Sequence, residues 1–301
     1  MSIAKTTHKT TISLNDFKEL TKMGLSISVV FSSIAGYFLG ADQIDFITIL
    51  LLAIGGYFMV GASNAFNQII ERDLDALMNR TKNRPIPAGR MSVNYAFAVA
   101  VIFTLLGIFT LYYINPKTAM YGAISIFIYT SLYTPLKTKT PLSVFVGAIP
   151  GAIPFMLGWV AARGHFGIEP GMLFAIQFFW QFPHFWAIGW LSYEDYKRGG
   201  FFMLPTGKQD TGTATQIIMY TVWTMIVSIL PVFGFTGDLS LSIVGAIIVF
   251  LLGGVMLFYA FKLYKDRTVK TAKELMLSSV FYITALQIIF VADKYLRLLW
   301  T

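Results

Sequence analysis

Residues 46–75 read FITILLLAIGGYFMVGASNAFNQIIERDLD, a long apolar run that ends in a cluster of acidic side chains. A helix that crosses a bilayer needs about 20 mostly apolar residues, and residues 46–70 meet this requirement. The stretch therefore predicts a transmembrane helix with an ionisable tip. Ionisable groups in such a helix are costly and are by default a sign of a functional site.

The rest of the chain has the composition of an integral membrane protein. Of its 301 residues, 56% are hydrophobic and 13% are charged, which is about half the charged fraction of a soluble domain. This composition excludes a water-soluble enzyme, and 27 Phe, 15 Tyr and 6 Trp exclude an intrinsically disordered chain. Because the sequence has no cysteine, disulfides and cysteine-ligated metal centres are also excluded.

Apolar runs of sufficient length predict an all-α protein with nine transmembrane helices. The expected spans are about 24–41, 46–70, 94–114, 118–136, 142–162, 171–192, 216–235, 241–261 and 274–292. Nineteen of the 23 Lys and Arg residues fall in the N-terminal arm and in the second, fourth, sixth and eighth joints. By the positive-inside rule we expect a cytoplasmic N-terminus and an outside C-terminus, in a bacterial plasma membrane rather than a mitochondrial inner membrane.

The chain divides into an N-terminal arm, residues 1–23, and a single transmembrane domain, residues 24–301. The arm lacks the apolar stretch of a signal peptide and is expected to lie, solvated, on anionic lipid. Two loops that follow acidic helix ends resemble each other, Ile86-Pro-Ala-Gly-Arg90 and Leu204-Pro-Thr-Gly-Lys208. Because four spans separate them, we expect a parallel internal repeat with halves 24–140 and 141–265, followed by a ninth helix at 274–292. Both acidic tips would then meet at one cavity.

Four oxygen-bearing side chains share one face of the helix tip: Asn64, Asn67, Glu71 and Asp75. At about 100° per residue these four lie within about 80° of one another, whereas Asp73 points away. Stacked carboxylate and amide oxygens suit Mg²⁺, and the next loop supplies the cations Arg80, Lys82 and Arg84. The combination predicts a magnesium–diphosphate site. The alternative, a solvated helix end with ordinary loop charges, explains the basic residues but not the shared face of the acids.

The sixth span ends in a second acidic tip. His184 and Asp195 are eleven residues apart and share a face if the helix is unbroken, although Pro183 can kink it. Asp195 follows Glu194 and precedes two basic residues, Lys197 and Arg198. For His184, a ligand or acid–base role and a hydrogen-bonded packing role are both open.

The fourth joint adds two candidates on the same side of the membrane. Lys137 can contact phosphate oxygens, and the ring face of Tyr133 can stabilise a developing cation.

At these residues the chain resembles the UbiA superfamily of intramembrane prenyltransferases, from about residue 20 to residue 290. The first family motif, Asn-x3-Asp-x3-Asp, reads Asn67, Glu71 and Asp75 here, with Glu in place of the first Asp. The second, usually Asp-x3-Asp, has Leu191 in its first position and matches only at Asp195. Five stretches of the chain are similar to the heme-modifying branch of the family: residues 71–75, the Arg-Thr-x-x-Arg-Pro run at 80–85, and residues 133–137, 183–186 and 194–196.

The resemblance implies a nine-helix fold, Mg²⁺ as cofactor, and farnesyl diphosphate and heme B as substrates. Farnesyl transfer to a heme vinyl group, with addition of water, would give heme O. The lipid bilayer and heme A synthase, the next enzyme of that pathway, are implied partners, and no nucleic acid is expected.

The resemblance also suggests roles for individual residues. One metal ion is assigned to Asn67, Glu71 and Asp75, and a second to Asp195 with Glu194. The candidate diphosphate contacts are Arg80, Lys82, Arg84, Lys137, Lys197 and Arg198. The candidates for orienting heme are His184, by axial contact with iron, and the nearby Trp180 and Trp186.

Two other functions fit part of the pattern. A prenyltransferase that makes a quinone or chlorophyll precursor would share the first acidic motif, but the incomplete second motif and residues 183–186 favour heme. A secondary transporter would also be a helical bundle with repeats and intramembrane acids, but transporters place such charges near the bilayer midplane rather than at the helix tips.

Overall fold

The computed structural model describes residues 12–299, which form helices joined by loops and contain no β-strand. The prediction of an all-helical protein is therefore confirmed. In chain order the elements are α1 (Leu14–Thr21), α2 (Met23–Gly40), α3 (Phe46–Ile70), α4 (Arg72–Asp75), α5 (Val93–Ile114), α6 (Pro116–Phe127), the π-helix η1 (Ile128–Tyr133), α7 (Thr134–Leu136), α8 (Ser143–Arg163), α9 (Ile168–Leu191), α10 (Tyr193–Arg198), α11 (Thr211–Ile229), the 3-10 helix η2 (Leu230–Phe233), α12 (Ile243–Asp266) and α13 (Val269–Leu298).

Within residues 12–299, seven helical segments are long and apolar enough to cross a membrane: α2, α3, α5, α8, α11 with η2, α12 and α13. The expected fourth and sixth spans fall outside this set. The helix α6 has 12 residues before the π-helix interrupts it, and α9 carries the polar residues Gln177, Gln181 and His184. Apolar side chains such as Leu105 and Leu251 are more than half exposed on the outer helix faces, as lipid contact requires.

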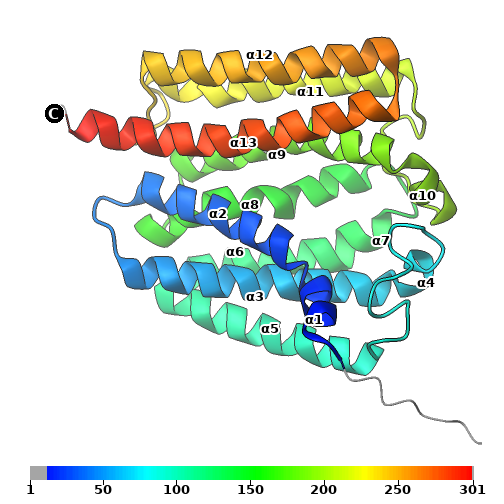
Figure 1. Cartoon of the computed structure of the whole chain (residues 1–301). Coiled ribbons are helices and arrows are strands. Elements are labelled where there is room, and N and C mark those ends of the chain that lie inside the picture. The colour runs from blue at the N-terminus through cyan, green and yellow to red at the C-terminus, as the bar shows by residue number, and fades with distance from the viewer. Residues whose placement is uncertain (1–11, 300–301) are drawn as a thin grey trace, which may run out of the picture.

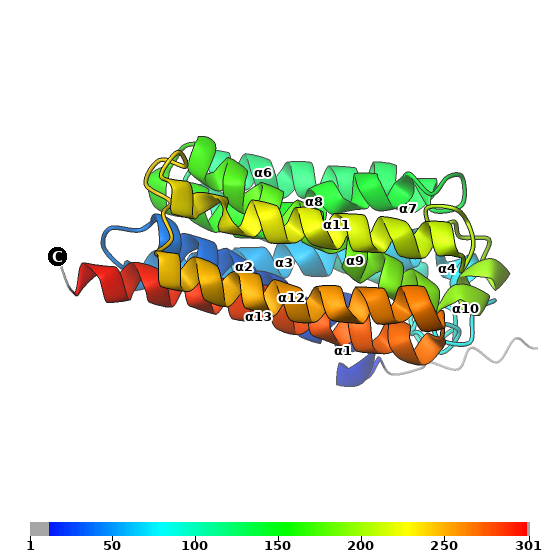
Figure 2. The ribbon, with the colours of Figure 1, turned by 90° about the horizontal axis from the view of Figure 1, so that it is seen from above.

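The long helices lie side by side in one bundle (Figure 1, Figure 2). Neighbours along the chain pack on each other from α2 through α3, α5, α6, α8, α9, α11 and α12 to α13. The main further contacts join distant segments: α13 packs on α2 and on α9, and α2 packs closely on α8. The contacts of α2 with α3 and of α3 with α5 have counterparts in the contacts of α8 with α9 and of α9 with α11.

Two glycines allow α2 and α8 to pack backbone against backbone. A Cβ atom on Gly36 would lie 2.0 Å from the carbonyl oxygen of Phe155, and one on Gly158 would lie 1.8 Å from that of Ser33. Small residues at such crossings are typical of membrane helices, where close van der Waals packing holds helices together. The crossing fixes the two central helices that line the cavity described below.

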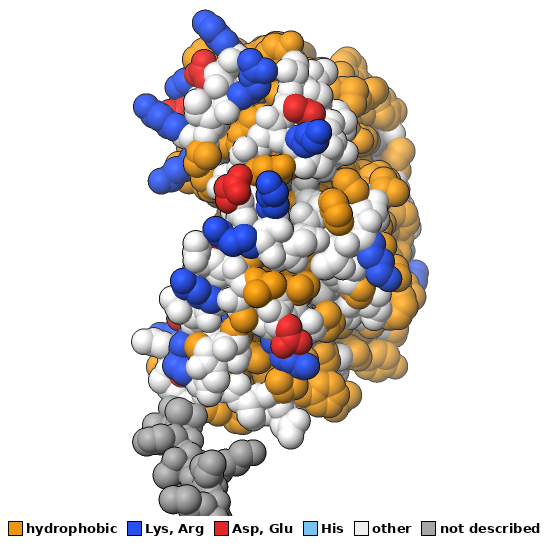
Figure 3. Space-filling model, turned by 90° about the vertical axis from the view of Figure 1, so that its right-hand side faces the viewer, with side chains coloured by type: hydrophobic (Ala, Val, Ile, Leu, Met, Phe, Trp, Pro, Cys, Tyr) orange, Lys and Arg blue, Asp and Glu red, His pale blue; other side chains and the backbone are white. Residues whose placement is uncertain are grey.

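The polar loops gather at one end of the bundle. The elements α4, α7 and α10 lie there, whereas the C-terminal end of α13 lies at the opposite end (Figure 1). Lys and Arg side chains, with fewer Asp and Glu, are spread over this end of the molecule (Figure 3). The two similar loops have the same turn, with φ of +73° at Gly89 and +76° at Gly207. Each glycine amide donates to the carbonyl three residues earlier, over 3.0 Å to Ile86 and 2.9 Å to Leu204.

The N-terminal arm is docked onto the bundle in the part that the structure describes; residues 1–11 of the predicted arm lie outside the described residues. Ser13 and Asp16 form a capping box at the start of α1. The Arg90 guanidinium, 2.7 Å from Asp16, and the Ser13 hydroxyl hold the pKa of the Asp16 carboxyl below its usual range. Leu20 is fully buried, so the last turn of α1 is part of the core.

Candidate active site

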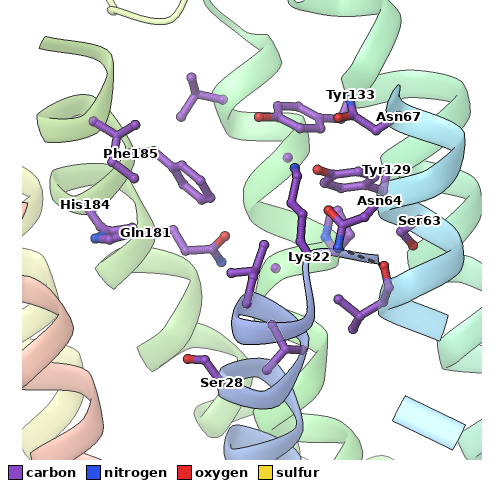
Figure 4. A pocket seen from close by; sticks show the side chains of 18 of the residues that line it. Lys22, Ser28, Ser63, Asn64, Asn67, Tyr129, Tyr133, Gln181, His184 and Phe185 are labelled. Atoms are coloured by element: carbon purple, nitrogen blue, oxygen red, sulfur yellow. Dashed lines mark hydrogen bonds between the residues drawn. The ribbon is translucent and has the colours of Figure 1, made fainter. Parts of the chain in front are cut away.

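A cavity of about 730 Å³ extends from the charged end into the bundle. Side chains from α2, α3, η1, α8, α9 and α13, and from the loop after α4, line it. Figure 4 shows Asn64, Asn67 and Tyr133 on one side of the cavity and His184 and Phe185 on the other. One wall therefore carries polar groups of α3 and η1, and the facing wall carries aromatic groups of α9.

The acidic residues of the first motif lie on the polar wall. The helix α3 ends at Ile70, and Glu71 joins it to α4. The backbone pattern nevertheless continues, because the Glu71 amide donates to Asn67 over 2.9 Å and the Asp75 amide donates to Glu71 over 2.7 Å. Asn67, Glu71 and Asp75 therefore stay on one face, and each is at most 4% exposed. Asp73 points away, with 84% of its side chain exposed.

Each buried carboxylate is paired with a cation from a different loop. Lys137 Nζ lies 2.7 Å from Glu71 Oε1, and Arg84 Nη1 lies 2.7 Å from Asp75 Oδ2. Although burial disfavours the charged ammonium, the Glu71 carboxylate raises the pKa of Lys137 above its ordinary value. The pairs hold two acids and two bases at the same end of the cavity.

The acid pair fits a magnesium ion that is shared with a phosphate ligand. Asp75 Oδ1 is buried and has no hydrogen-bond partner within residues 12–299, and a buried anionic oxygen of this kind is costly unless a cation meets it. The described residues contain no group of three or more His, Cys, Asp or Glu that could hold a metal. Mg²⁺ is usually held by one or two carboxylates together with substrate phosphates, so two acids are enough.

Asn67 is held in place by Thr134, the first residue of α7, which directly follows the π-helix η1. Its Nδ2 donates to Thr134 Oγ1 over 3.2 Å, and that hydroxyl donates to the carbonyl of Tyr129 over 2.8 Å. Pro135 follows directly, and a proline inside a helix removes one backbone hydrogen bond and clashes with the preceding turn. The wider π-turn takes up this conflict, and it directs Tyr129 and Tyr133 into the cavity.

Tyr133 has a cation over its ring. Lys137 Nζ lies 4.7 Å from the centroid of the Tyr133 ring and 5.4 Å from that of Phe201. Such a ring face attracts positive charge through its quadrupole. The arrangement therefore contains an aromatic face that already stabilises a cation next to the acid pair.

Asp195 holds the loop that carries Arg80. Its carboxylate accepts from the amides of Asn79, at 3.0 Å, and Arg80, at 3.1 Å, and pairs with Arg198. These hydrogen bonds, led by that from Arg198, hold the pKa of the Asp195 carboxyl below its usual range. The helical hydrogen bonds continue through Ser192, from its amide to Ile188 and from the Tyr196 amide to Ser192. Asp195 nevertheless does not line the cavity, because its carboxylate faces the backbone of Asn79 and Arg80.

The structure brings together only part of the candidate set. Cavity-lining members are Asn67, Glu71, Asp75, Arg80, Arg84, Tyr133, Lys137, Trp180 and His184. Outside the lining are Lys82, Trp186, Glu194, Asp195, Lys197 and Arg198. Lys82 Nζ donates to Asn79 Oδ1 over 3.1 Å, and the buried Trp186 ring packs 5.1 Å from that of Tyr220. Glu194 and Lys197 are exposed on α10.

His184 and Trp180 form one stacked unit on the aromatic wall. Their ring centroids are 4.7 Å apart at an interplanar angle of 17°. Both are hydrogen-bonded to Ser279 of α13, His184 through Nδ1 at 2.8 Å and Trp180 through Nε1 at 2.7 Å to the backbone oxygen. The imidazole therefore has a fixed position and orientation in the wall.

Lys22, which the sequence predicts to lie in the solvated N-terminal arm, lines the cavity instead. It joins α1 to α2 with a φ of +45°, in the left-handed region that non-glycine residues rarely adopt, and its side chain points into the cavity (Figure 4). Burial and the charges of Arg84 and Lys137 lower the pKa of Lys22 to about 7. Strained residues of this kind cluster at functional sites, but no sequence pattern showed the turn.

Comparison with known proteins places this geometry in a family. The profile of the UbiA prenyltransferase family matches residues 29–285. The chain belongs to the UbiA prenyltransferase family. The predicted resemblance is confirmed, and membership favours a prenyltransferase over a secondary transporter.

Relatives of the family agree over nearly the full length. A protoheme IX farnesyltransferase from Christiangramia forsetii is 72% identical, with 94% of this chain and 95% of the relative covered. The bundle is similar to a digeranylgeranylglyceryl phosphate synthase, with a TM-score of 0.76, 19% identity, and coverage of 93% and 98% of the two chains. It is also similar to a UbiA homologue from Archaeoglobus fulgidus bound to GPP and Mg²⁺, with a TM-score of 0.68, 16% identity, and coverage of 92% and 99%.

Proposed function

We propose that the protein is a protoheme IX farnesyltransferase, a heme O synthase. It transfers the farnesyl group of farnesyl diphosphate to a vinyl group of heme B and releases diphosphate. The observation that carries the proposal is the 72% identity, over 94% of the chain, to a protein of that name. The buried acids Glu71 and Asp75, paired with Lys137 and Arg84, support it, because they supply the charges that a magnesium diphosphate needs.

In this proposal the polar end of the cavity binds the diphosphate. Glu71 and Asp75, with Asn67, would hold Mg²⁺, which when bound stabilises negative charge on the leaving diphosphate. Arg84 and Lys137, which pair with Asp75 and Glu71, would turn to the phosphate oxygens. Arg80 and Lys22, which also line the cavity, would add two further cations.

The transfer then follows from charge separation in the cavity. The bond between C1 of the farnesyl group and its oxygen breaks, and its electron pair leaves with diphosphate. The π electrons of the heme vinyl group form the new carbon–carbon bond with C1, and water adds to the resulting cation and loses a proton to the released diphosphate. The Tyr133 ring stabilises the allylic cation, and the aromatic wall excludes competing water until the new bond has formed.

His184 and Trp180 would position the heme. His184 lies seven residues before the end of α9, which places it about 10 Å inside the helix tip. Iron held by His184 would leave the rim of the porphyrin, where the vinyl groups are, to face the diphosphate end. His184 would be the axial contact to the heme iron, whereas Trp186 packs away from the cavity.

A competition between acceptors tests the function. Purified protein in detergent, given farnesyl diphosphate and Mg²⁺, is offered heme B and 4-hydroxybenzoate together. We expect a farnesylated, hydrated heme and no prenylated benzoate, as resolved by chromatography and mass spectrometry. Prenylated benzoate as the main product would overturn the proposal in favour of a quinone-type prenyltransferase.

The role of Asp195 gives a second prediction. The sequence assigns it, with Glu194, to a second metal ion, but its oxygens hold the amides of Asn79 and Arg80. We propose that Asp195 positions the Arg80 loop. Asp195→Asn is then expected to raise the KM for farnesyl diphosphate about tenfold, a loss of about 1.4 kcal/mol, with an unchanged Mg²⁺ requirement. Glu194→Gln is the matched control, and a higher Mg²⁺ requirement in Asp195→Asn alone would restore the metal role.

The lowered pKa of Lys22 predicts that diphosphate binding depends on pH. Because its pKa is lowered to about 7 in the free protein, Lys22 loses its charge above that pH, whereas a bound diphosphate favours the charged form. Binding above about pH 7 must therefore take up a proton, and affinity for magnesium pyrophosphate should fall by up to about tenfold per pH unit. Isothermal titration calorimetry measures this. Lys22→Arg stays charged and should flatten the profile; an unchanged slope in that variant would contradict the assignment.

We also propose the finer membrane topology. Nine spans, formed by the seven apolar segments together with α9 and the α6–η1–α7 segment, would place the N-terminus in the cytoplasm and the C-terminus outside a bacterial cell membrane. A parallel repeat of residues 24–140 and 141–265, followed by the ninth helix, is supported by the matched turns at Gly89 and Gly207 and by the repeated packing order. Because heme O is poorly soluble, transfer to a membrane-bound heme A synthase is the proposed next step.

A further inference from the structure

Ser279 of α13 joins two residues of the aromatic wall through separate atoms. Its hydroxyl oxygen lies 2.8 Å from His184 Nδ1, and its backbone oxygen accepts from Trp180 Nε1 at 2.7 Å. Ser279 is fully buried. The stacked pair of His184 and Trp180 is therefore anchored to one residue on the neighbouring helix.

The hydrogen-bond directions around Ser279 determine where the imidazole proton lies. A serine hydroxyl has one hydrogen to donate, and that of Ser279 is donated to the carbonyl of Met276 over 2.7 Å. The hydroxyl oxygen must then accept from His184, so the imidazole carries its proton on Nδ1. In a neutral imidazole the other nitrogen is unprotonated, and among residues 12–299 no hydrogen bond to His184 Nε2 is formed.

We propose that Ser279 is a positioning residue that fixes His184 as the Nδ1–H tautomer and leaves the Nε2 lone pair for the iron of the heme B substrate. The inference rests on the proposed function, because it needs heme in the cavity. A histidine that binds a metal through one nitrogen donates from the other to an oxygen, and that partner sets the orientation and basicity of the ligand. Trp180 limits rotation of the ring by stacking on it.

Nuclear magnetic resonance of the ¹⁵N-labelled imidazoles tests the tautomer directly. The chain has three histidines, so His184→Gln identifies the His184 signals. We expect wild-type protein, in detergent and without heme, to show a protonated Nδ1 and an unprotonated Nε2 at His184. A protonated Nε2 would overturn the proposal, whatever the enzyme's activity.

Ferric heme B binding, followed by absorption and electron paramagnetic resonance spectra, tests the consequence. Ser279→Ala should weaken binding about 10- to 100-fold and change the ligand-field signals, and Ser279→Thr should restore both. Ser278→Ala is the matched control, because Ser278 makes the same kind of bond, over 2.8 Å to Leu275, without contacting His184. Wild-type affinity and spectra in Ser279→Ala would contradict the inference.

The two failures can be told apart. If wild-type protein forms heme O and Ser279→Ala has unchanged heme spectra, only the role of Ser279 is wrong. If the histidine signature is present and no farnesylated heme is formed, the proposed function is wrong instead.

Discussion

Replacing Asp75 by asparagine is expected to lower kcat for farnesyl transfer about 10³-fold, which approaches complete loss of activity. Asp75 is fully buried, pairs with Arg84 at 2.7 Å and has a second oxygen without a partner. The amide keeps the volume but removes the negative charge that would hold Mg²⁺ against the diphosphate. Losing one such preorganised electrostatic contact typically costs about 10²- to 10³-fold in rate, and the unpaired Arg84 adds to the loss.

Asp73→Asn is the matched control for this prediction. Asp73 is two residues away in the same short helix, and 84% of its side chain is exposed. Its replacement should leave heme conversion, measured by chromatography with purified protein and Mg²⁺, close to wild type. Near-normal turnover of Asp75→Asn would remove the acid pair from the active site, and equal losses in both variants would point to a general defect of folding.

Gly158→Ala should be the most destabilising single-methyl change in the bundle. The added Cβ would lie 1.8 Å from the carbonyl oxygen of Ser33 and 2.4 Å from the amide nitrogen of Tyr37. Because both contacts are backbone atoms, only a separation of α2 and α8 can relieve them. We expect a cost of about 3 kcal/mol and a fall of about 6 °C in the apparent melting temperature.

Gly254→Ala in α12 provides the comparison. A Cβ atom there meets nothing within 4 Å, and alanine is favoured over glycine in a helix by about 1 kcal/mol. Intrinsic tryptophan fluorescence on heating can follow both variants, since the chain contains 6 Trp and no cysteine for thiol-reactive dyes. Equal melting temperatures for the two variants would show that the crossing of α2 and α8 is looser than described.

Local periodicity was enough to predict the polar wall of the cavity. Asn67, Glu71 and Asp75 share a face because backbone hydrogen bonds of the helical spacing continue through the break at Glu71. The sequence also predicts that basic residues of the neighbouring loops lie close to these acids. Which basic residue pairs with which acid depends on how the loops fold. Only the structure pairs Lys137 with Glu71 and Arg84 with Asp75.

The features that sequence reasoning missed depend on tertiary contacts or unusual backbone. Lys22 enters the cavity through a left-handed turn between α1 and α2, which nothing in the local sequence requires. The apolar run at 118–136 predicts a fourth span, but it does not show that a π-turn precedes Pro135. The periodicity of the second acidic tip predicts a shared face for His184 and Asp195, but the Asp195 carboxylate binds the backbone amides of Asn79 and Arg80, on a loop that local sequence cannot place.

The central claim is that the acid pair of α3 and α4 binds the metal–diphosphate end of the substrate. The most direct measurement is a crystal structure with Mn²⁺ and a non-hydrolysable farnesyl thiodiphosphate, in which anomalous scattering locates the metal. The account predicts a manganese peak in contact with Asp75 and Glu71, with Arg84 and Lys137 turned to the phosphate oxygens. A peak bound at α10 alone, with the pairs of Glu71 and Asp75 intact, would contradict it.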